Sequence, residues 1–246
     1  MIKAILFDQD GVIIDSERNG HRLAFEKAFR QFGYDIQWDP DLYHKLLQVG
    51  GGKERIQHYF ENVYTGSKRP DNLDRFVQEI HAVKTTAFID MLEEIPLRPG
   101  IRRFMKEGNE LGIPLGICTT SNERVASTVA DKILHDVQFE FVLAGDMVTT
   151  KKPDPEIYLK ALDILKVKPS EALVLEDSNI GVRAAKAAGC NVLATYNEYT
   201  KHEDLSLADA IVSSLGESGE LAVFSTPAIA LEQPGIIHVK DLLKVF

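Results

Sequence analysis

The sequence contains only two cysteines, Cys118 and Cys190, and they form neither a CxxC motif nor another paired spacing. A disulfide framework and a structural zinc site are therefore not expected, because both need several cysteines at characteristic spacings. No apolar run approaches the roughly 18 residues that a membrane-spanning helix requires. The first residues do not combine a charged segment with a long apolar stretch, so we expect no signal peptide and a cytoplasmic location.

The chain also lacks an excess of positive charge. It has 28 Lys and Arg residues against 37 Asp and Glu residues, which gives a net charge of −9. Nucleic acids and anionic membranes attract basic surfaces, so we expect neither as a partner. A small anionic substrate remains compatible, because a few cations can concentrate positive potential in one cleft. With 246 residues, 44% of them hydrophobic, the chain suits one large domain or a core with a smaller partner domain.

Short apolar runs that alternate with helical patterns predict a parallel sheet covered by helices. One intervening helix begins at Asp154-Pro155, and residues 216–246 give only a weak pattern. Alternation of this kind is typical of βαβ units, so the predicted fold class is α/β with a Rossmann-like parallel sheet. The predicted strands are residues 2–7, 114–118, 139–144, 172–175 and 191–195, with an edge strand at 210–212.

Residues 16–92 differ from the rest because their apolar spacing is helical throughout. Phe25, Ala28, Phe29 and Phe32 form one helical stripe, and Asp39-Pro40 is a typical helix start. We therefore predict an inserted helical domain of residues 16–92 in an α/β core domain of residues 1–15 and 93–246. Such insertions commonly form lids over sites at the carboxyl ends of strands.

Polar residues follow four successive segments of the predicted sheet. Taken singly, each of these groups is an ordinary strand end or helix cap, as Thr120 with Glu123 illustrates. Together they provide carboxylates, hydroxyls and a lysine at one edge, which suits a magnesium ion and a transferring phosphoryl group. The groups are Asp8-Gln9-Asp10, Thr119-Thr120-Ser121-Asn122, Lys151-Lys152-Pro153 and Glu176-Asp177-Ser178.

The segments FDQDG, CTTSN, KKPDPEIY and LEDSNIG, in this order and spacing, resemble the four motifs of the haloacid dehalogenase superfamily. The helical insertion directly after the first motif is similar to the subclass with a helical cap. The resemblance covers essentially the whole chain. It implies a Rossmann-like core, a magnesium cofactor and a phosphatase that forms an aspartyl-phosphate.

Carried onto this sequence, the resemblance implies that Asp8 attacks phosphorus and that Asp10 acts as general acid and then general base. A true dehalogenase lacks the second aspartate, so Asp10 favours a phosphatase. The implied phosphate ligands are Thr119, Thr120 and Lys152. The implied magnesium ligands are Asp8, the carbonyl of Asp10 and Asp177, with Glu176 binding directly or through water.

The glycine-rich stretch VGGGKERIQHYF invites comparison with a nucleotide P-loop, but the template fails. Leu47 occupies the position of the first glycine, and Lys53 precedes Glu54 rather than Ser or Thr. A plain helix stop needs fewer than three glycines. We therefore predict that Gly51 and Gly52 let the backbone approach an anion, with Lys53 and Arg55 beside it.

This stretch, together with DSERNGHRLAFEKAF, LRPGI and CTTSNE, is similar to the CbbY-type phosphatases. That group removes the 1-phosphate of xylulose 1,5-bisphosphate to give xylulose 5-phosphate. We therefore expect a monomer that acts on a small sugar bisphosphate, in the plastid stroma if the chain is the mature form of a plant protein. Further candidates for the second phosphate are Arg98, Ser121 and Asn122, and candidates for the sugar hydroxyls are Glu17 and His21.

Two other functions compete with this one. A β-phosphoglucomutase-like phosphomutase would use the same Asp8 and Asp10 but pass the phosphoryl group to a sugar hydroxyl. A receiver-type signalling module also combines an aspartate, magnesium and a lysine. It would carry its phosphorylated aspartate on a later strand and would have no use for a lid.

Overall fold

The computed structural model describes residues 1–226 and 229–246, so residues 227 and 228 of the weakly patterned segment lie outside it. The chain forms two compact units, one of residues 1–15 and 96–246 and one of residues 16–95. The helical unit ends at Ile95 rather than at residue 92, because a short 3-10 helix, Leu92–Glu94, follows its last long helix. Leu92 and Ile95 are buried. In the described part of the chain, no helix is both long and apolar enough to span a membrane.

The core unit is built on a sheet whose order, over the described residues, is β3-β2-β1-β4-β5-β6-β7. All neighbouring pairs are parallel except β6 and β7. The α/β prediction is therefore confirmed, and the antiparallel β7 is the strand that the apolar pattern did not indicate. The bounds are β1 Ala4–Phe7, β2 Leu115–Cys118, β3 Phe141–Leu143, β4 Ala172–Glu176, β5 Asn191–Thr195, β6 Ala210–Val212 and β7 Phe224–Thr226.

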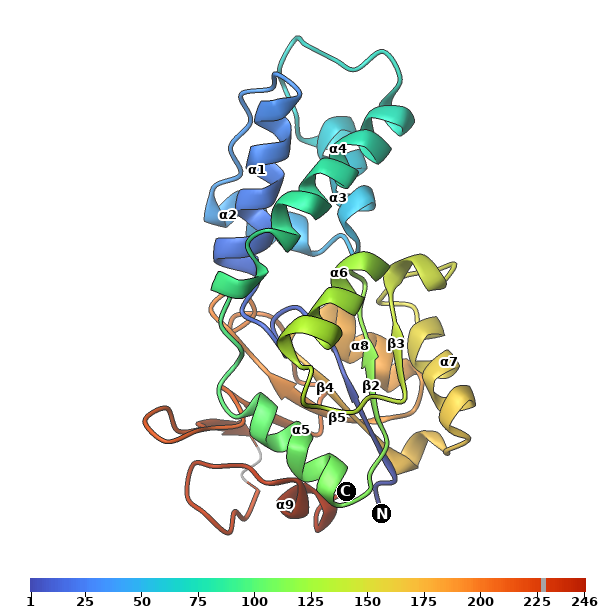
Figure 1. Ribbon diagram of the computed structural model, residues 1–246, viewed down its shortest axis with the longest axis vertical. Coiled ribbons are helices and arrows are strands. Elements are labelled where there is room, and N and C mark those ends of the chain that lie inside the picture. The colour runs from blue at the N-terminus through green and yellow to red at the C-terminus, as the bar shows by residue number, and fades with distance from the viewer. Residues whose placement is uncertain (227–228) are drawn as a thin grey trace. The chain divides into compact units, whose positions relative to one another are not determined.

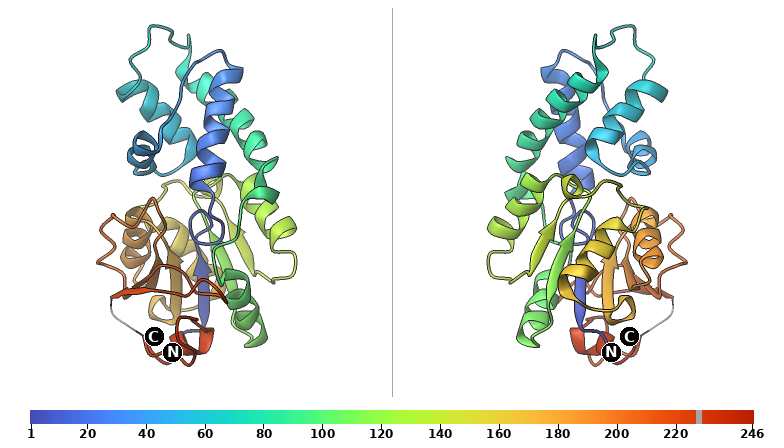
Figure 2. Two further views of the ribbon diagram at one scale, coloured as in Figure 1. Left: turned by 90° about the vertical axis from the view of Figure 1, so that its left-hand side faces the viewer. Right: turned by 90° about the vertical axis from the view of Figure 1, so that its right-hand side faces the viewer.

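Helices cover both faces of this sheet, as Figure 2 shows. Helices α5 (Ile101–Glu110) and α6 (Glu123–Thr128) lie on one face. Helices α7 (Glu156–Leu165) and α8 (Asn179–Ala187) lie on the other. Because side chains alternate along a strand, Leu6 joins the cluster under α7 and α8 while Phe7 meets Phe104 of α5 edge to face at 6.3 Å.

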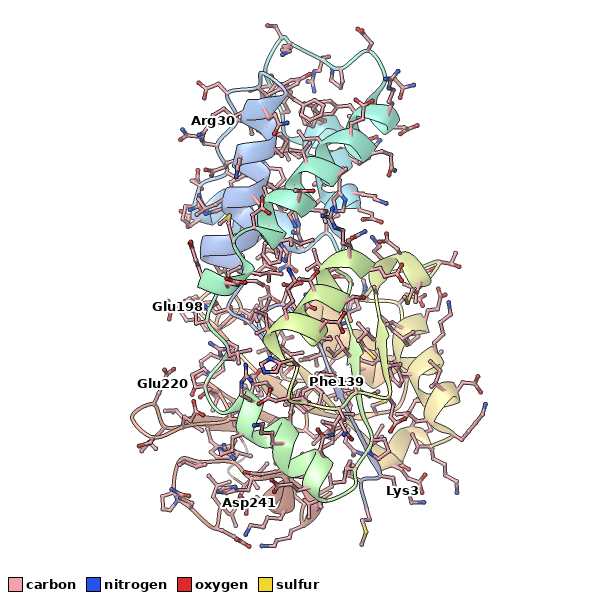
Figure 3. The ribbon with its side chains drawn as sticks, viewed as in Figure 1. Lys3, Arg30, Phe139, Glu198, Glu220 and Asp241 are labelled. Carbon is pink, nitrogen blue, oxygen red and sulfur yellow. The ribbon has the colours of Figure 1, made fainter. Side chains whose placement is uncertain are left out.

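The last segment of the chain is fixed to α5 by polar contacts. Glu107 accepts hydrogen bonds from the Val239 backbone N–H and from Arg103, at 3.0 and 2.7 Å. It also lies 2.8 Å from Nδ1 of His238, just before α9 (Val239–Leu243). Asp241, labelled in Figure 3, is fully buried and accepts a hydrogen bond from the His238 backbone N–H at 3.0 Å. These contacts order a segment that has little regular secondary structure.

The helical unit contains α1 (Arg22–Gln31), α2 (Pro40–Leu47), α3 (Gly52–Asn62) and α4 (Leu73–Ile89), drawn in blue to green in Figure 1. The side chains of Asp39 and Asn72 cap α2 and α4, as their residue types favour. An aromatic cluster forms the interior of the unit. At its centre Trp38 is fully buried, with its ring 4.7 Å from that of Phe25 and 5.0 Å from that of Phe29.

Candidate active site

The carboxyl ends of β1, β2 and β4 bring the polar motif residues of the core together. β1 pairs with β2 on one side and with β4 on the other, so residues that follow these three strands meet at one edge. Asp8 continues the ladder beyond β1, since its N–H donates to the Leu175 carbonyl at 2.9 Å. Thr119 follows β2 in the same way, with its N–H on the Leu143 carbonyl at 3.0 Å.

Lys152 connects the ends of these strands. Its Nζ lies 2.6 Å from Oδ1 of Asp8 and 2.6 Å from Oε1 of Glu176, and it donates to the Cys118 carbonyl at 2.8 Å. All three charged side chains are buried. The lysine therefore lies where it can bind a phosphoryl group transferred to Asp8, as the third motif predicts.

Burial and charge shift the protonation of these groups in opposite directions. Burial, with the added repulsion of Glu176 and Asp10, raises the pKa of Asp8 to about 8 in spite of the attraction of Lys152. Burial alone would lower the pKa of Lys152, but Asp8 and Glu176 raise it above its ordinary value. The site thus keeps its ammonium charged beside two buried carboxylates.

The carboxylates of the site are grouped closely enough to bind a metal ion. Asp8, Glu176 and Asp177 are buried and offer carboxylate oxygens that all lie within 4.8 Å of one another. Oxygen donors of this kind suit magnesium, and one lysine does not balance three carboxylates. The residues present therefore fit a divalent cation.

Two glycines, which have no side chain, leave space for these carboxylates. Gly11 has φ +86°, and a Cβ there would lie 2.1 Å from Oδ2 of Asp177. A Cβ on Gly181 would lie 1.9 Å from Oε2 of Glu176. Asn197, which follows β5, donates to the same Oδ2 of Asp177 at 2.6 Å. A side chain at either glycine would displace a predicted metal ligand.

The second motif links Asp10 and Thr119 through Ser121. Ser121 donates from Oγ to Oδ2 of Asp10 at 2.5 Å, and its N–H donates to Oγ1 of Thr119 at 3.0 Å. Asn122 caps α6 and donates to Asp146 at 2.5 Å. Thr120 is half-buried, and its carbonyl lies against Gly145, where a Cβ would come within 2.3 Å. Asp10, Ser121 and Thr119 are thus linked by hydrogen bonds, whereas Thr120 and Asn122 contact the segment that follows β3.

Arg98 belongs to the core unit but serves a different set of partners. Its Nη2 donates to the carbonyls of Tyr196 and Ser213, at 2.7 and 2.6 Å. These carbonyls follow β5 and β6, so Arg98 holds two strand ends together. Its predicted contact with substrate stays a prediction.

Within the helical unit, Glu17 and His21 each have a buried or half-buried polar partner. Tyr43 donates from its hydroxyl to Oε2 of Glu17 at 2.5 Å. Nζ of Lys84 lies 2.7 Å from Nδ1 of His21, whose ring stacks on Phe88 at 3.8 Å. Lys84 was not among the predicted residues, although a lysine between Ile80 and Phe88 on the buried face of α4 was a usable signal.

The glycine-rich stretch forms the start of α3. Gly51 has φ +94° and precedes the helix, and a Cβ on Gly52 would lie 2.7 Å from Nε2 of His81. Lys53 is half-buried. Arg55 is buried and donates to the carbonyls of Leu46 and Val49 at 3.1 and 3.3 Å, so it holds the turn between α2 and α3. Its predicted role as an anion ligand stays a prediction.

Comparison with known proteins gives a consistent result. Residues 2–189 match the model of the haloacid dehalogenase-like hydrolases. The chain is 41% identical over 224 residues to a CBBY-like protein of Arabidopsis thaliana, covering 88% of this chain and 70% of that protein.

Two solved structures of CbbY from Rhodobacter sphaeroides are similar to this chain. The complex with phosphate has a TM-score of 0.81 and 38% identity, and the match covers 89% of this chain and 97% of that one. An Asp-to-Asn variant in complex with xylulose 1,5-bisphosphate has a TM-score of 0.81 and 37% identity, with the same coverage. With the buried acidic group and its lysine in place, we conclude that this chain is a phosphatase of the haloacid dehalogenase-like hydrolase family and similar to CbbY.

Proposed function

We propose that this protein is a magnesium-dependent phosphatase that hydrolyses xylulose 1,5-bisphosphate to xylulose 5-phosphate through an aspartyl-phosphate. The observation that carries the proposal is the buried group of Asp8, Glu176 and Asp177 with Lys152 on two of its carboxylates. The choice of sugar is supported by the related CbbY structure that holds xylulose 1,5-bisphosphate. Membership in a hydrolase family argues against a receiver-type signalling module.

In the first step, an oxygen of the Asp8 carboxylate forms a bond to phosphorus, and the bond from phosphorus to the sugar oxygen breaks. Asp10 gives a proton to that leaving oxygen, which departs as the free hydroxyl of xylulose 5-phosphate. Ser121, which donates to Oδ2 of Asp10, orients the carboxyl group.

In the second step, the ionised Asp10 takes a proton from a water molecule as that water attacks phosphorus. The bond between phosphorus and Asp8 breaks. This step releases inorganic phosphate and regenerates the Asp8 carboxylate. Lys152 and Thr119 bind the oxygens of the transferring group in both steps, with Thr120 in support.

Asp8, Asp177 and the Asp10 carbonyl, with Glu176 directly or through water, would hold the magnesium ion, which reduces the repulsion between the carboxylate nucleophile and the phosphate. We assign the second phosphate of the substrate to a set of backbone and basic or polar groups. Glu17 and His21 are the candidates for the sugar hydroxyls. The set for the second phosphate is Gly51, Gly52, Lys53, Arg55, Arg98, Ser121 and Asn122.

The proposal is tested by phosphate release with magnesium across xylulose 1,5-bisphosphate, ribulose 1,5-bisphosphate, fructose 1,6-bisphosphate and glucose 1-phosphate. We expect the highest kcat/KM for xylulose 1,5-bisphosphate and no turnover by Asp8→Asn. Full activity of Asp8→Asn would show that the nucleophile is wrongly assigned. A higher kcat/KM for another sugar phosphate would show that the substrate is wrongly assigned, but it would leave the assigned reaction unchanged.

Incubation with glucose 1-phosphate and a bisphosphate primer distinguishes hydrolysis from phosphomutase chemistry. We expect inorganic phosphate as the product of the reaction. Formation of glucose 6-phosphate faster than phosphate release would overturn the phosphatase assignment in favour of the mutase.

A further inference from the structure

Tyr158, on α7, touches the candidate active site through two parts of its side chain. It is fully buried, and its hydroxyl donates to Oε1 of Glu176. The same oxygen accepts from Nζ of Lys152 at 2.6 Å. The Tyr158 ring also faces this ammonium, with its centroid 5.0 Å from Nζ. One aromatic side chain therefore contacts both an acid and the lysine of the site.

These contacts restrict the orientation of Glu176. Two donors occupy Oε1, while the Asp177 backbone N–H lies 3.2 Å from Oε2. A buried carboxylate that lost one of these donors would be less well satisfied and free to rotate. The ring of Tyr158 adds a favourable electrostatic contact to a buried ammonium.

We propose that Tyr158 is a positioning residue, whose hydroxyl fixes the Glu176 carboxylate for magnesium. The inference rests on the magnesium requirement proposed above. Tyr158 also packs in the apolar cluster of the sheet, with Ala161 and Leu162 of the same helix. A purely packing role would need the ring alone, whereas the positioning role needs the hydroxyl.

Tyr158→Phe separates these two roles, because it keeps the ring and removes the hydroxyl. We expect the dissociation constant for Mg²⁺, measured by calorimetric titration without substrate, to rise about 10-fold. The rise in melting temperature on adding Mg²⁺ should shrink in parallel. The matched control is Tyr59→Phe, which alters a buried tyrosine of the helical unit and should leave Mg²⁺ binding unchanged.

A double-mutant cycle with Glu176→Gln tests whether Tyr158 acts through Glu176. If it does, Tyr158→Phe weakens Mg²⁺ binding in the natural background and has no further effect in Glu176→Gln. If the single variant Tyr158→Phe had the same dissociation constant for Mg²⁺ as the unaltered protein, the inference would be overturned. It would also be overturned by a Tyr158→Phe protein that does not fold, or by an unaltered protein without saturable Mg²⁺ binding.

The inference and the proposed function can fail separately. Weakened Mg²⁺ binding in Tyr158→Phe, together with no hydrolysis of any sugar phosphate by the unaltered protein, would support the inference and reject the function. Hydrolysis of xylulose 1,5-bisphosphate with unaltered Mg²⁺ binding in Tyr158→Phe would do the reverse.

Discussion

The ammonium of Lys152 lies 2.6 Å from Oδ1 of Asp8, and both side chains are buried at the carboxyl edge of the sheet. The same ammonium also lies 2.6 Å from Glu176, so one cation serves two buried carboxylates. Burial, together with the neighbouring acids Glu176 and Asp10, raises the pKa of Asp8 to about 8 in spite of this ammonium. The site is thus electrostatically costly for the fold in the absence of a bound cation.

The first prediction concerns stability and pH. The folded-state pKa of Asp8 lies above its unfolded value of about 4, so the folded protein binds more protons between these two values. The stability that the folded protein gains from binding this proton is fully present below about pH 4. It declines as the pH rises towards about 8. Asp8→Asn cannot ionise. We expect its melting temperature, in EDTA, to fall less over this pH range than that of the unaltered protein.

Calorimetry at several pH values checks this expectation, and the variant should be the more stable of the two proteins at pH of about 8. Saturating Mg²⁺ should stabilise the unaltered protein more than the variant, because the variant has lost a charged ligand. Parallel pH profiles in EDTA would contradict the assignment.

Gly181→Ala is the second prediction. A Cβ there would lie between 1.9 and 2.2 Å from the carboxyl atoms of Glu176, so the carboxylate has to move. We expect Mg²⁺ affinity to fall about 10- to 100-fold while the helix itself is retained. Gly108→Ala on α5, which places a Cβ 3.0 Å from the side chain of Leu115 on β2, is the control. Equal Mg²⁺ affinity for both variants, measured by titration, would show that Glu176 can shift without harm.

The third prediction concerns Glu156, at the start of α7. Its carboxylate accepts hydrogen bonds from the backbone N–H groups of Thr149 and Thr150, which lower its pKa to about 2. It therefore fixes the loop that leads to Lys152. We expect Glu156→Ala to reduce kcat by about 10-fold or more, because it would displace Lys152, the proposed phosphate ligand, from the reacting group. Glu156→Gln should restore part of this loss, since its amide oxygen still accepts one bond.

Asp163→Asn provides the matched control on the same helix, since its exposed side chain pairs with the nearby Lys166. Steady-state kinetics with xylulose 1,5-bisphosphate measures all three variants. A loss of kcat in Asp163→Asn as large as that in Glu156→Ala would point to the helix as a whole rather than to the loop.

The fourth prediction concerns Gln9, between Asp8 and Asp10. It is fully buried, and neither amide atom has a hydrogen-bond partner in the described part of the chain. Burying an unpaired amide is unfavourable, so Gln9→Leu should stabilise the protein by about 1 kcal/mol. Denaturant unfolding measures the change. A lower unfolding free energy for Gln9→Leu would indicate that the amide has an unseen partner, such as a buried water.

The fold could be predicted largely because its strands are short apolar runs with polar ends. The run at residues 191–195 corresponds to β5 without adjustment, whereas the run at 2–7 is trimmed to Ala4–Phe7. The antiparallel β7, Phe224–Thr226, escaped prediction because Ser225 and Thr226 give it no apolar run, whereas the equally short β6 is the apolar run Ala210–Val212.

The candidate site was predictable where residues end a strand or follow it directly, as Glu176 does in the first way and Asp8 and Thr119 do in the second. Tyr158 and Lys84 were missed because each lies within a helix, on a face that sequence periodicity assigns to packing. Asn197 had a usable signal, since it follows β5 as Asp8 follows β1. Contacts between residues far apart in the chain, such as Lys152 with Asp8, emerge only from the fold.

Trp38 has a practical consequence for measurement. It is the only tryptophan of the chain, and it lies within the aromatic cluster of the helical unit. Its emission therefore reports the unfolding of that unit, whereas far-ultraviolet circular dichroism reports both units together. If the two signals change at different denaturant concentrations, the inserted helices and the sheet unfold as separate cooperative bodies. The protein thus contains an intrinsic fluorescent probe for one of its two units.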